Sequence, residues 1–342
     1  MKFFVYCPSG VVTGGAELLH QFVSVLNDFG YNAFIVYYGE SSRSIPSAYE
    51  KYNLHLSEEI EDAEDNVVVL YEGYFLPLSF IENAKIVLWW LSVDNFYYCQ
   101  SDSISLFDLY KFNKKLFLKE LVKFFLRRRN PHIFSLKDLV NDKRIVFNAY
   151  QSEYAKSFLV QHNFKNLHSL KDYINDDFFY NDKTNIKKEN CIVYNPKKGY
   201  QFTKKLISKS PYLNWIPIEK MTRDQVKDLL RRAKIYVDFG YHPGKDRIPR
   251  EAAMSGCCVI TGKQGSAGVY EDIPIDEQKY KFAQKRRNIK EILKAISEIL
   301  KNYEYVVEDF SFYRKKIASE KKEFIEDCKS LAYFFTKKIE KS

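Results

Sequence analysis

The chain has 342 residues and 46% of them are hydrophobic, so its length and composition predict two packed domains and exclude an intrinsically disordered protein. It contains no run of eighteen apolar residues, which argues against a membrane-spanning helix. The formal net charge of +9 favours a polyanionic partner, which could be nucleic acid, an anionic membrane surface or a phosphorylated substrate.

Neither the cysteines nor the first residues indicate export. The six cysteines form no C-x-x-C pair, and two of them, Cys257 and Cys258, lie in a hydrophobic run. We therefore expect free thiols in the core of a protein from a reducing compartment, with no disulfide or zinc framework. The opening residues, MKFFVYCPSG, hold too short an apolar run for a signal sequence, so we expect a cytoplasmic protein.

The first half of the chain alternates short apolar runs with helical periodicity. A strand over Lys2–Cys7 leads into the loop Ser9–Gly15, which holds three glycines, and the apolar spacing then predicts a helix over Ala16–Phe29. Three further strands are predicted at Ala33–Tyr38, Val67–Tyr71 and Lys85–Trp90. This order is typical of a doubly wound parallel sheet, which binds ligands beyond the carboxyl ends of its strands.

The stretch Leu106–Phe134 interrupts this alternation and predicts a basic amphipathic helix. Its eight cations are Lys111, Lys114, Lys115, Lys119, Lys123, Arg127, Arg128 and Arg129. Apolar side chains recur on the other side, at Tyr110, Phe117, Leu121, Phe124 and Phe125. The segment Lys111–Arg129 could therefore bind an anionic membrane surface, and the alternative is a surface helix with its apolar face in the core.

A second series of strands and helices begins near Tyr150. Arg144–Asn148 is the expected last strand of the first half, and Ser152 is the expected N-cap of the next helix. The later strands are predicted at Cys191–Tyr194, Trp215–Ile218, Lys234–Phe239 and Cys257–Thr261, and the later helices at Tyr200–Lys209, Thr222–Arg232, Asn288–Leu300 and Ser311–Lys341. The pattern predicts an α/β protein of two Rossmann-like domains, 1–150 and 151–342, which face each other across a cleft. The C-terminal helix could pack back on the first domain.

The segment Tyr241–Gly265 combines cations, glycines and an expected helix start. Pro249 suits the first helical position, which places Arg250 and Glu251 in the first turn. Unpaired N–H groups at a helix N-terminus bind anions, and Lys245, Arg247 and Arg250 add positive charge. Glu251 would repel a phosphate but could accept hydrogen bonds from ribose hydroxyls. The alternative is a first-turn carboxylate that is stabilised by the helix dipole.

Two other loops follow predicted strands and could contact phosphate. Asn195–Gly199 offers Lys197 or Lys198 to a diphosphate, and Thr13–Gly15 precedes the first helix. The window SGVVTGGAE does not match G-x-G-x-x-G, and no Walker motif is present. A dinucleotide site or a P-loop is therefore not expected.

Together these segments resemble the GT-B glycosyltransferases, enzymes with two Rossmann-like domains. Gly14–Glu17 resembles their GGAE motif, Arg250–Ile260 (REAAMSGCCVI) resembles their EAMACGxPVI segment, and Gly262–Tyr270 resembles the glycine-bearing turn that follows. The match is nearest to the retaining, sucrose-synthase-like superfamily, which contains many bacterial surface-polysaccharide enzymes.

The resemblance implies roles for the matched residues. Glu251 would bind the donor ribose, and Lys198 the donor diphosphate. The residues expected near the donor phosphates or sugar are Gly14, Gly15, Gln264, Gly265 and Ser266. No metal ion or cofactor is expected, since helix dipoles and cations would neutralise the leaving nucleotide.

One position departs from the superfamily pattern. A second glutamate often precedes the matched one by eight positions, but Pro243 stands there in this chain. Asp246, His242 or Lys245 could replace its contact with the sugar, and Asp246 is a candidate catalytic residue beside Asp94. This leaves the donor and the stereochemistry open. The pair His242-Pro243 also resembles the HP pair of nucleotide-binding sialyltransferases, so a CMP-activated acidic sugar is a minor alternative.

The first half is expected to supply the acceptor chemistry. In LWWLSVDNF a strand runs into a loop that contains Asp94. Asp94 is the candidate general base of an inverting reaction, and in a retaining reaction it could orient hydroxyls. The alternative is a carboxylate that caps the following helix.

The sequence thus predicts transfer of a sugar from a nucleotide-sugar donor to a glycan or lipid-linked acceptor in surface polysaccharide synthesis, such as capsule or lipopolysaccharide. The enzyme could also be peripheral at the inner face of the membrane, and nucleic acid is not an expected partner. Two alternatives remain open: a sugar-nucleotide epimerase of the same architecture, and a non-enzymatic nucleic-acid-binding protein.

Overall fold

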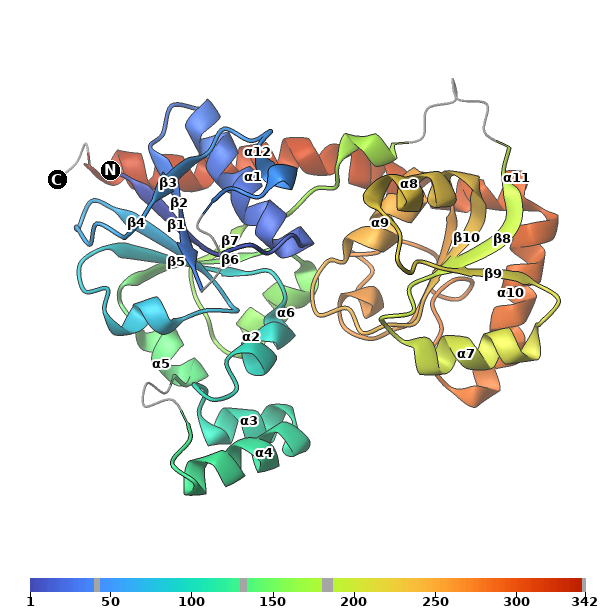
Figure 1. Ribbon diagram of the computed structural model, residues 1–342, viewed down its shortest axis with the longest axis horizontal. Helices are drawn as coiled ribbons and strands as arrows, with labels where there is room; N and C mark the ends of the chain where they lie inside the picture. Colours follow the sequence, from blue (N-terminus) through green and yellow to red (C-terminus); the bar gives the residue numbers. More distant parts are fainter. Residues whose placement is uncertain (40–43, 130–133, 180–186, 340–342) are drawn as a thin grey trace. The chain divides into compact units, whose positions relative to one another are not determined.

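The computed structural model describes residues 1–39, 44–129, 134–179 and 187–339, and it divides the chain into two compact units (Figure 1). Unit 1 comprises Met1–Lys171 and Glu323–Ser342, and unit 2 comprises Asp172–Lys322. This division falls later than the predicted boundary at residue 150. The reason is that β7 (Leu167–Ser169) is a strand of the first sheet and α6 (Glu153–Gln161) packs on that sheet.

Unit 1 is built on a parallel sheet of seven strands in the order β3-β2-β1-β4-β5-β6-β7. Besides β7, its strands are β1 (Phe3–Pro8), β2 (Ala33–Tyr38), β3 (His55–Ser57), β4 (Val67–Tyr71), β5 (Lys85–Trp90) and β6 (Ile145–Tyr150). The predicted doubly wound parallel sheet is confirmed. The edge strands β3 and β7 escaped prediction because each has three residues and no apolar run.

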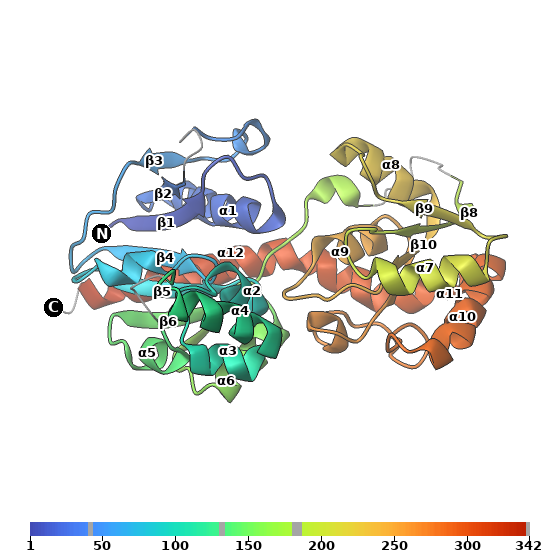
Figure 2. The same ribbon diagram turned by 60° about the horizontal axis from the view of Figure 1, so that its bottom comes forward.

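Successive side chains of β5 point to opposite faces of this sheet and bind different helices. Trp89 packs edge-on against Phe22 of α1 (Gly14–Asp28), with 5.4 Å between ring centroids. Trp90 packs on the other face, against Phe96 of α2 (Val93–Cys99) and Phe158 of α6. Both faces are therefore covered, and Figure 2 shows helices on either side of the strands.

The C-terminal helix α12 (Ser311–Ile339) ends on the sheet of unit 1. Phe335 contacts Phe3 of β1 and Phe147 of β6, with ring centroids 6.1 Å and 5.8 Å apart. Phe334 adds a second edge-on contact to Phe147. The expectation that this helix packs back on the first domain is confirmed.

The basic insertion forms two helices instead of the single predicted one. They are α3 (Leu106–Phe112) and α4 (Lys114–Phe125), and residues 130–133 of the predicted insertion lie outside the described residues. Asn113 divides them, because its side chain accepts hydrogen bonds from the N–H groups of Lys115 and Leu116 and so starts a new helix. A further short helix, α5 (Leu136–Asn141), leads into β6.

Unit 2 contains a second parallel sheet, of four strands in the order β11-β10-β8-β9. The strands are β8 (Glu189–Tyr194), β9 (Asn214–Pro217), β10 (Ala233–Asp238) and β11 (Cys258–Thr261). Its helices are α7 (Tyr200–Lys209), α8 (Arg223–Arg232), α9 (Arg247–Met254), α10 (Ile289–Lys301) and α11 (Tyr303–Val306). The predicted capping box of Thr222 and Gln225 is present at the start of α8.

The helix α9 begins at Arg247, two residues before the predicted start. Pro249 therefore occupies the third helical position, which is tolerated because the N–H groups of the first turn have no partner within the helix. As a result Glu251 lies beyond the first turn of α9. The alternative that the helix dipole stabilises its carboxylate is weakened, because that effect falls off after the first turn.

All six cysteines are free, and five of them are buried, as expected for core residues. Among the described residues, no helix combines the length and apolarity that a bilayer crossing requires.

Candidate functional site

The strand order of unit 2 places its candidate site at the carboxyl ends of β8 and β10. The chain leaves β8 toward β9 on one side, while β10 lies on the other side, so the order reverses between these two strands. In open parallel sheets a crevice forms outside the carboxyl ends of the strands at such a point. The two loops that start there are residues 195–199 and 239–246, and both contain predicted site residues.

Glycine backbone atoms bring these two loops into contact. Gly199 has a φ of +63°, and a Cβ on it would lie 2.2 Å from the backbone of Phe239. A Cβ on Gly240 would lie 2.6 Å from the Cβ of Lys198. The close backbone approach expected at Gly199 is therefore made to the neighbouring loop, and the two glycines set the position of Lys198.

The turn after β11 joins the same cluster. His242 and Gly265 form an isolated parallel bridge, in which the N–H of Ser266 donates to the carbonyl of His242 at 2.9 Å. The Ser266 hydroxyl is buried and donates to the carbonyl of Gly244 at 2.5 Å, whereas Gln264 is exposed. The fold thus brings together the predicted residues Lys198, His242, Asp246, Gln264, Gly265 and Ser266.

Alternating charges run through this cluster. The Lys198 ammonium donates to Asp246 at 2.5 Å, and Asp246 Oδ2 lies 3.8 Å from Nδ1 of His242. Nε2 of His242 lies 3.3 Å from Asp238, which also accepts hydrogen bonds from the Tyr236 hydroxyl and the Gly240 N–H. Asp246 stands at the N-cap of α9 but makes no side-chain capping bond there. Its carboxylate accepts a hydrogen bond from Lys198 and none from the N–H groups at the start of α9.

The surroundings of His242 and Asp238 favour the charged form of each side chain. Burial alone would lower the pKa of His242, but the hydrogen bond and charge of Asp238 and the charge of Asp246 outweigh it and raise that pKa. Burial alone would raise the pKa of Asp238, yet His242 and the Gly240 N–H hold it below its usual value. Both shifts favour an imidazolium at His242, which lies between the two carboxylates.

Asp238, His242 and Asp246 also offer atoms of the kind that bind metal ions, all within 4.8 Å of one another. The two carboxylates face different ring nitrogens, however, and Asp246 already accepts from Lys198. Each of the two carboxylates thus already has a cationic partner. We therefore interpret the cluster as a network of ion pairs.

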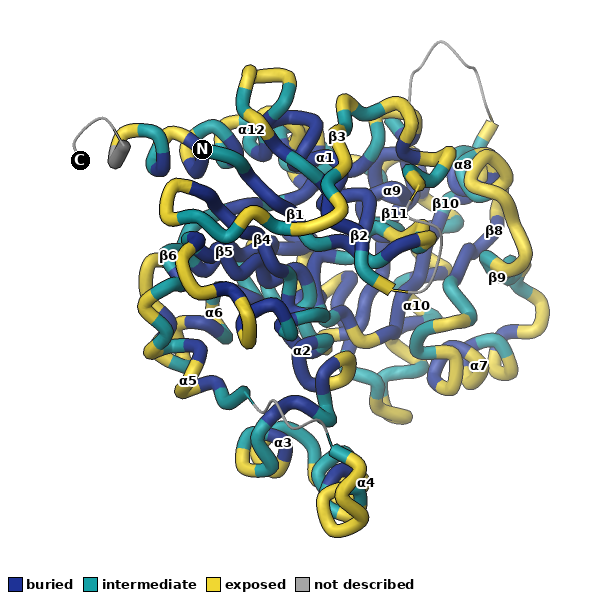
Figure 3. The backbone as a smooth tube through the Cα atoms, turned by 60° about the vertical axis from the view of Figure 1, so that its left-hand side comes forward, coloured by how far each residue is buried: buried dark blue, intermediate teal, exposed yellow. Residues whose placement is uncertain are grey.

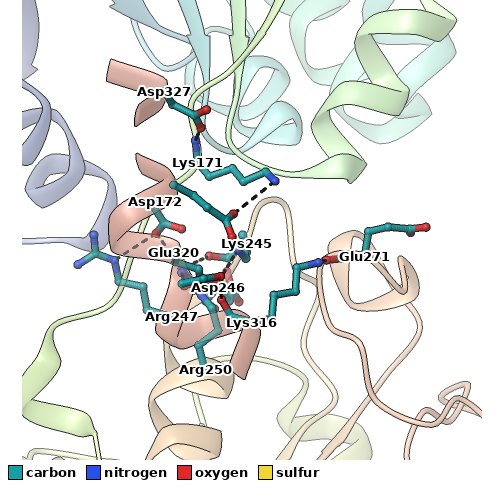
Figure 4. A network of polar contacts seen from close by, with 12 residues as sticks. Lys171, Asp172, Lys245, Asp246, Arg247, Arg250, Glu271, Lys316, Glu320 and Asp327 are labelled. Carbon is teal, nitrogen blue, oxygen red and sulfur yellow. Dashed lines mark hydrogen bonds and ion pairs between the residues drawn. The ribbon is translucent and has the colours of Figure 1, made fainter. Parts of the chain in front are cut away.

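A second charge cluster lies behind the 239–246 loop, around Arg250 (Figure 4). The Arg250 guanidinium is fully buried and donates to Asp172 and to Glu320, each at 2.7 Å. It also donates to the backbone carbonyls of Lys245 and Asp246. Lys245 pairs with Glu320 as well, and Arg247 lies 3.5 Å from Asp172. The charge of Arg250 outweighs the burial of Asp172 and holds the pKa of that carboxyl below its usual value.

This cluster gives Lys245 and Arg250 a defined structural role. Both side chains are buried, and both anchor the loop to Glu320 on α12. Their observed contacts hold the loop in its conformation. A contact of either residue with a donor remains a prediction. Glu251 lies next to Arg250 on α9 and is 8% exposed.

In unit 1, the strand order reverses between β1 and β4. The predicted Gly14 and Gly15 open α1 directly after β1, where Thr13 caps the helix by accepting from the Ala16 N–H. Gly15 is exposed, and a Cβ there would make an ordinary contact with Leu91. The two glycines thus stand at the carboxyl edge of the sheet, as the sequence predicts.

Asp94 lies in the first turn of α2 and is 5% exposed. The Tyr154 hydroxyl donates to its carboxylate at 3.2 Å. Ser92 holds the N-cap position, so Asp94 does not cap the helix as the alternative supposed.

Glu72, a buried carboxyl directly after β4, was not among the predicted site residues. It accepts hydrogen bonds from the N–H groups of Leu91 and Ser92, both at 2.8 Å, and thereby holds the loop before Asp94. Burial raises the pKa of Glu72 to about 7, against the lowering effect of these hydrogen bonds. An acidic residue at the end of an apolar strand was the one available clue.

No protein-family model matches the sequence, and no curated protein does either. The structure is similar to a glycosyltransferase from Rickettsia africae ESF-5, with a TM-score of 0.62 and 11% identity over 100% of this chain and 99% of that one. It is also similar to sucrose-phosphate synthase from Thermosynechococcus elongatus, with a TM-score of 0.61 and 12% identity over 100% of both chains. WaaG, a glycosyltransferase involved in lipopolysaccharide biosynthesis, matches with a TM-score of 0.52 and 12% identity over 95% of this chain and 99% of WaaG.

At these identities the likeness establishes the fold, while activity has to be argued from the residues. Each unit of the chain carries a parallel sheet with helices on both faces, and the whole length aligns with glycosyltransferase structures. The chain therefore has the GT-B glycosyltransferase fold.

Proposed function

We propose that the protein transfers a sugar from a nucleotide-sugar donor to a glycan or lipid-linked acceptor, as a member of the retaining, sucrose-synthase-like superfamily. The observation that carries this proposal is the meeting of three loops at the carboxyl edge of the unit 2 sheet, where Lys198 and the N-terminus of α9 lie close to the 262–266 turn. A cation and the N-terminus of a helix suit a diphosphate, and Glu251 on the same helix suits a ribose. These groups would neutralise the leaving nucleotide without a metal ion.

The similarity to WaaG supports surface polysaccharide synthesis as the setting. Unit 1 would receive the acceptor beside the carboxyl end of its sheet. Asp94 and the 91–92 loop held by Glu72 stand there. If the reaction inverts configuration, Asp94 would take the acceptor proton, and Tyr154 would orient its carboxylate.

Donor binding is the first test. In a thermal-shift screen against UDP-, GDP-, ADP- and CMP-sugars, the true donor at about 100 times its dissociation constant should add about 2.7 kcal/mol of stability. Glu251→Gln should weaken binding of that donor about tenfold, because one charge-assisted hydrogen bond to the ribose is lost. Calorimetric titration of both proteins measures the difference.

Glu291→Gln, on the exposed face of α10, is the matched control and should bind the donor like the wild type. Equal donor affinity in Glu251→Gln would contradict the assignment of the ribose contact. Incubation with donor alone separates transfer from epimerisation, since inversion at C2 of the sugar without an acceptor would identify an epimerase. The anomeric configuration of the glycoside product then decides between retention and inversion.

We further propose that α3 and α4 dock this enzyme on an anionic membrane surface. The exposed cations of the hairpin are Lys111, Lys114, Lys115, Lys119, Arg127 and Arg128. Its exposed apolar side chains are Phe107, Tyr110, Leu118, Val122, Phe124, Phe125 and Leu126. Figure 3 shows how little of this hairpin is buried. An apolar surface edged by cations fits the interface of anionic lipids.

Vesicle sedimentation tests this surface. The triple variant Lys115→Gln, Lys119→Gln, Arg128→Gln should bind phosphatidylglycerol vesicles at least about tenfold more weakly than the wild type, because each basic residue near such a surface adds about 1 kcal/mol. The matched control neutralises Lys204, Lys205 and Lys209 on α7 and should change little. Equal binding by both triple variants would remove the membrane proposal and leave the transferase proposal intact.

A further inference from the structure

A row of four charged side chains leads from the interior of unit 2 to the proposed donor site. Asp238, His242, Asp246 and Lys198 alternate in sign, and their exposed side-chain fractions are 2%, 0%, 19% and 37%. Each neighbouring pair lies within ion-pair distance, at 3.3 Å, 3.8 Å and 2.5 Å in that order. The row ends at the ammonium that would meet the diphosphate.

His242 cannot contact a ligand itself. Its ring is fully buried, and its two nitrogens face the carboxylates of Asp238 and Asp246. Its backbone is fixed as well, because its carbonyl accepts from the Ser266 N–H and its own N–H donates to the Gln264 carbonyl. Any effect of His242 on the donor must therefore pass through Asp246 and Lys198.

We propose that His242 is a positioning residue of the donor site, an imidazolium that holds Asp246 and through it directs Lys198 toward the donor diphosphate. The inference rests on the proposed function. With His242 protonated, the two carboxylates are offset by two cations and the row is neutral. With a neutral imidazole the row carries one net negative charge, which repels an anionic ligand at Lys198.

Charged and hydrogen-bonding groups reach the imidazole from several elements. The end of β10 contributes Asp238 and the Tyr236 hydroxyl that binds it, the start of α9 contributes Asp246, and the loop after β8 contributes Lys198. The turn after β11 contributes the N–H of Ser266 and the carbonyl of Gln264. Farther along α9, the charge of Glu251 reaches Tyr236. Among these residues, none places a positive charge between the imidazole and Asp238 or Asp246.

The direction in which the pKa of His242 is shifted determines how anion binding at Lys198 changes with pH. Because the folded protein raises the pKa of His242 above its ordinary value of 6.5, the imidazolium is the main form below pH 6.5. It is lost as the pH rises through the folded pKa. Anion binding at Lys198 should weaken over that same interval, and so should the stabilisation that the imidazolium gives to the fold.

Inorganic pyrophosphate is the probe, since it carries the proposed charge without a particular base or sugar. Calorimetric titration between pH 5.5 and 9 should show the wild type binding pyrophosphate about tenfold more tightly than His242→Gln at the acidic end. The two affinities should converge at the alkaline end, where the imidazole is neutral. Comparing the proteins at each pH cancels the titration of pyrophosphate itself.

Two controls identify the route of the effect. In a Lys198→Gln background, His242→Gln should change pyrophosphate affinity less than about twofold, because the charge it acts through is gone. His55→Gln, an exposed histidine of unit 1, should match the wild type at every pH. A residue that only supported the fold would lower the active fraction and leave the pH profile of the affinity unchanged.

The outcomes separate this inference from the proposed function. Equal affinity of wild type and His242→Gln at every pH would overturn the inference alone. Failure of the wild type to bind pyrophosphate at any pH would overturn the donor site and the inference with it. If His242→Gln does not fold, an NMR titration of the wild-type His242 ring replaces it. Pyrophosphate should then raise the midpoint of the titration, and an unchanged midpoint would reject the proposal.

Discussion

Arg250→Met should destabilise unit 2 by about 3 kcal/mol at pH 7, which is the lower end of the range for breaking a buried ion pair. The substitution keeps most of the buried volume but removes the guanidinium that binds both Asp172 and Glu320. The lower end applies because Lys245 still pairs with Glu320 and Arg247 still lies near Asp172. Scanning calorimetry of the purified chain measures the shift of the transition.

The pH dependence gives this prediction a second check. In the wild type the lowered pKa of Asp172 stabilises the fold above the ordinary carboxyl pKa, and this contribution is lost as the pH falls through the lowered value. Without Arg250 the buried carboxylate can protonate at a higher pH. The difference in stability between the two proteins should therefore be smaller at pH 4 than at pH 7.

Arg232→Met is the matched control, because Arg232 forms an exposed pair with Glu189, where the side chains are 48% and 46% exposed. Exposed pairs of this kind contribute at most about 1 kcal/mol. Adding Asp172→Asn and Glu320→Gln to Arg250→Met should recover part of the lost stability. A single Arg250→Met variant as stable as the wild type would show that the cluster does not support the loop.

Gly265→Ala should cost about 3 kcal/mol and also weaken donor binding. Gly265 has φ and ψ of +64° and −143°, a region that is essentially restricted to glycine. A Cβ there would lie 1.9 Å from the His242 carbonyl oxygen, so either the turn or the loop has to move. Movement of His242 would disturb Asp246 and Lys198. Calorimetry and donor titration on the same preparation measure both effects.

Gly262→Ala is the matched control three residues earlier in the same turn. Gly262 is not in the left-handed region, and its Cβ would lie 3.5 Å from Nε2 of Gln284, an ordinary contact. The change should cost less than about 1 kcal/mol. Comparable losses in both alanine variants would mean that the close approach at His242 is not what makes Gly265 necessary.

Local sequence signals were sufficient for most of the architecture. The strand-length apolar runs that became β2, β4 and β5 were predicted with their observed bounds, because buried parallel strands are continuous runs of β-branched and aromatic residues. Helix caps such as Thr222 were equally clear. Short edge strands and the break at Asn113 were missed, since tertiary pairing and one side-chain cap decide them.

Only part of the candidate site could be predicted from local sequence signals. Lys198 was singled out by its place after a strand, whereas His242, Asp246 and the 264–266 turn came from the resemblance to GT-B glycosyltransferases. The fold brings all of them together. The anionic partners were not predictable. Asp172 lies 78 residues and Glu320 lies 70 residues from Arg250 in sequence, so no local pattern reports that their charges meet. The sequence accordingly overstated how many of the cations are available to a ligand.

The cluster around Arg250 also determines which part of the chain could be isolated as a working fragment. Asp172 is the first residue of unit 2, and Glu320 lies in its last turn of helix before Lys322. A truncation that trimmed either terminus of this unit by a few residues would remove one of the two carboxylates that bind the buried Arg250. Expression of the unit alone must therefore keep both ends, although neither end contains a residue of the proposed donor site.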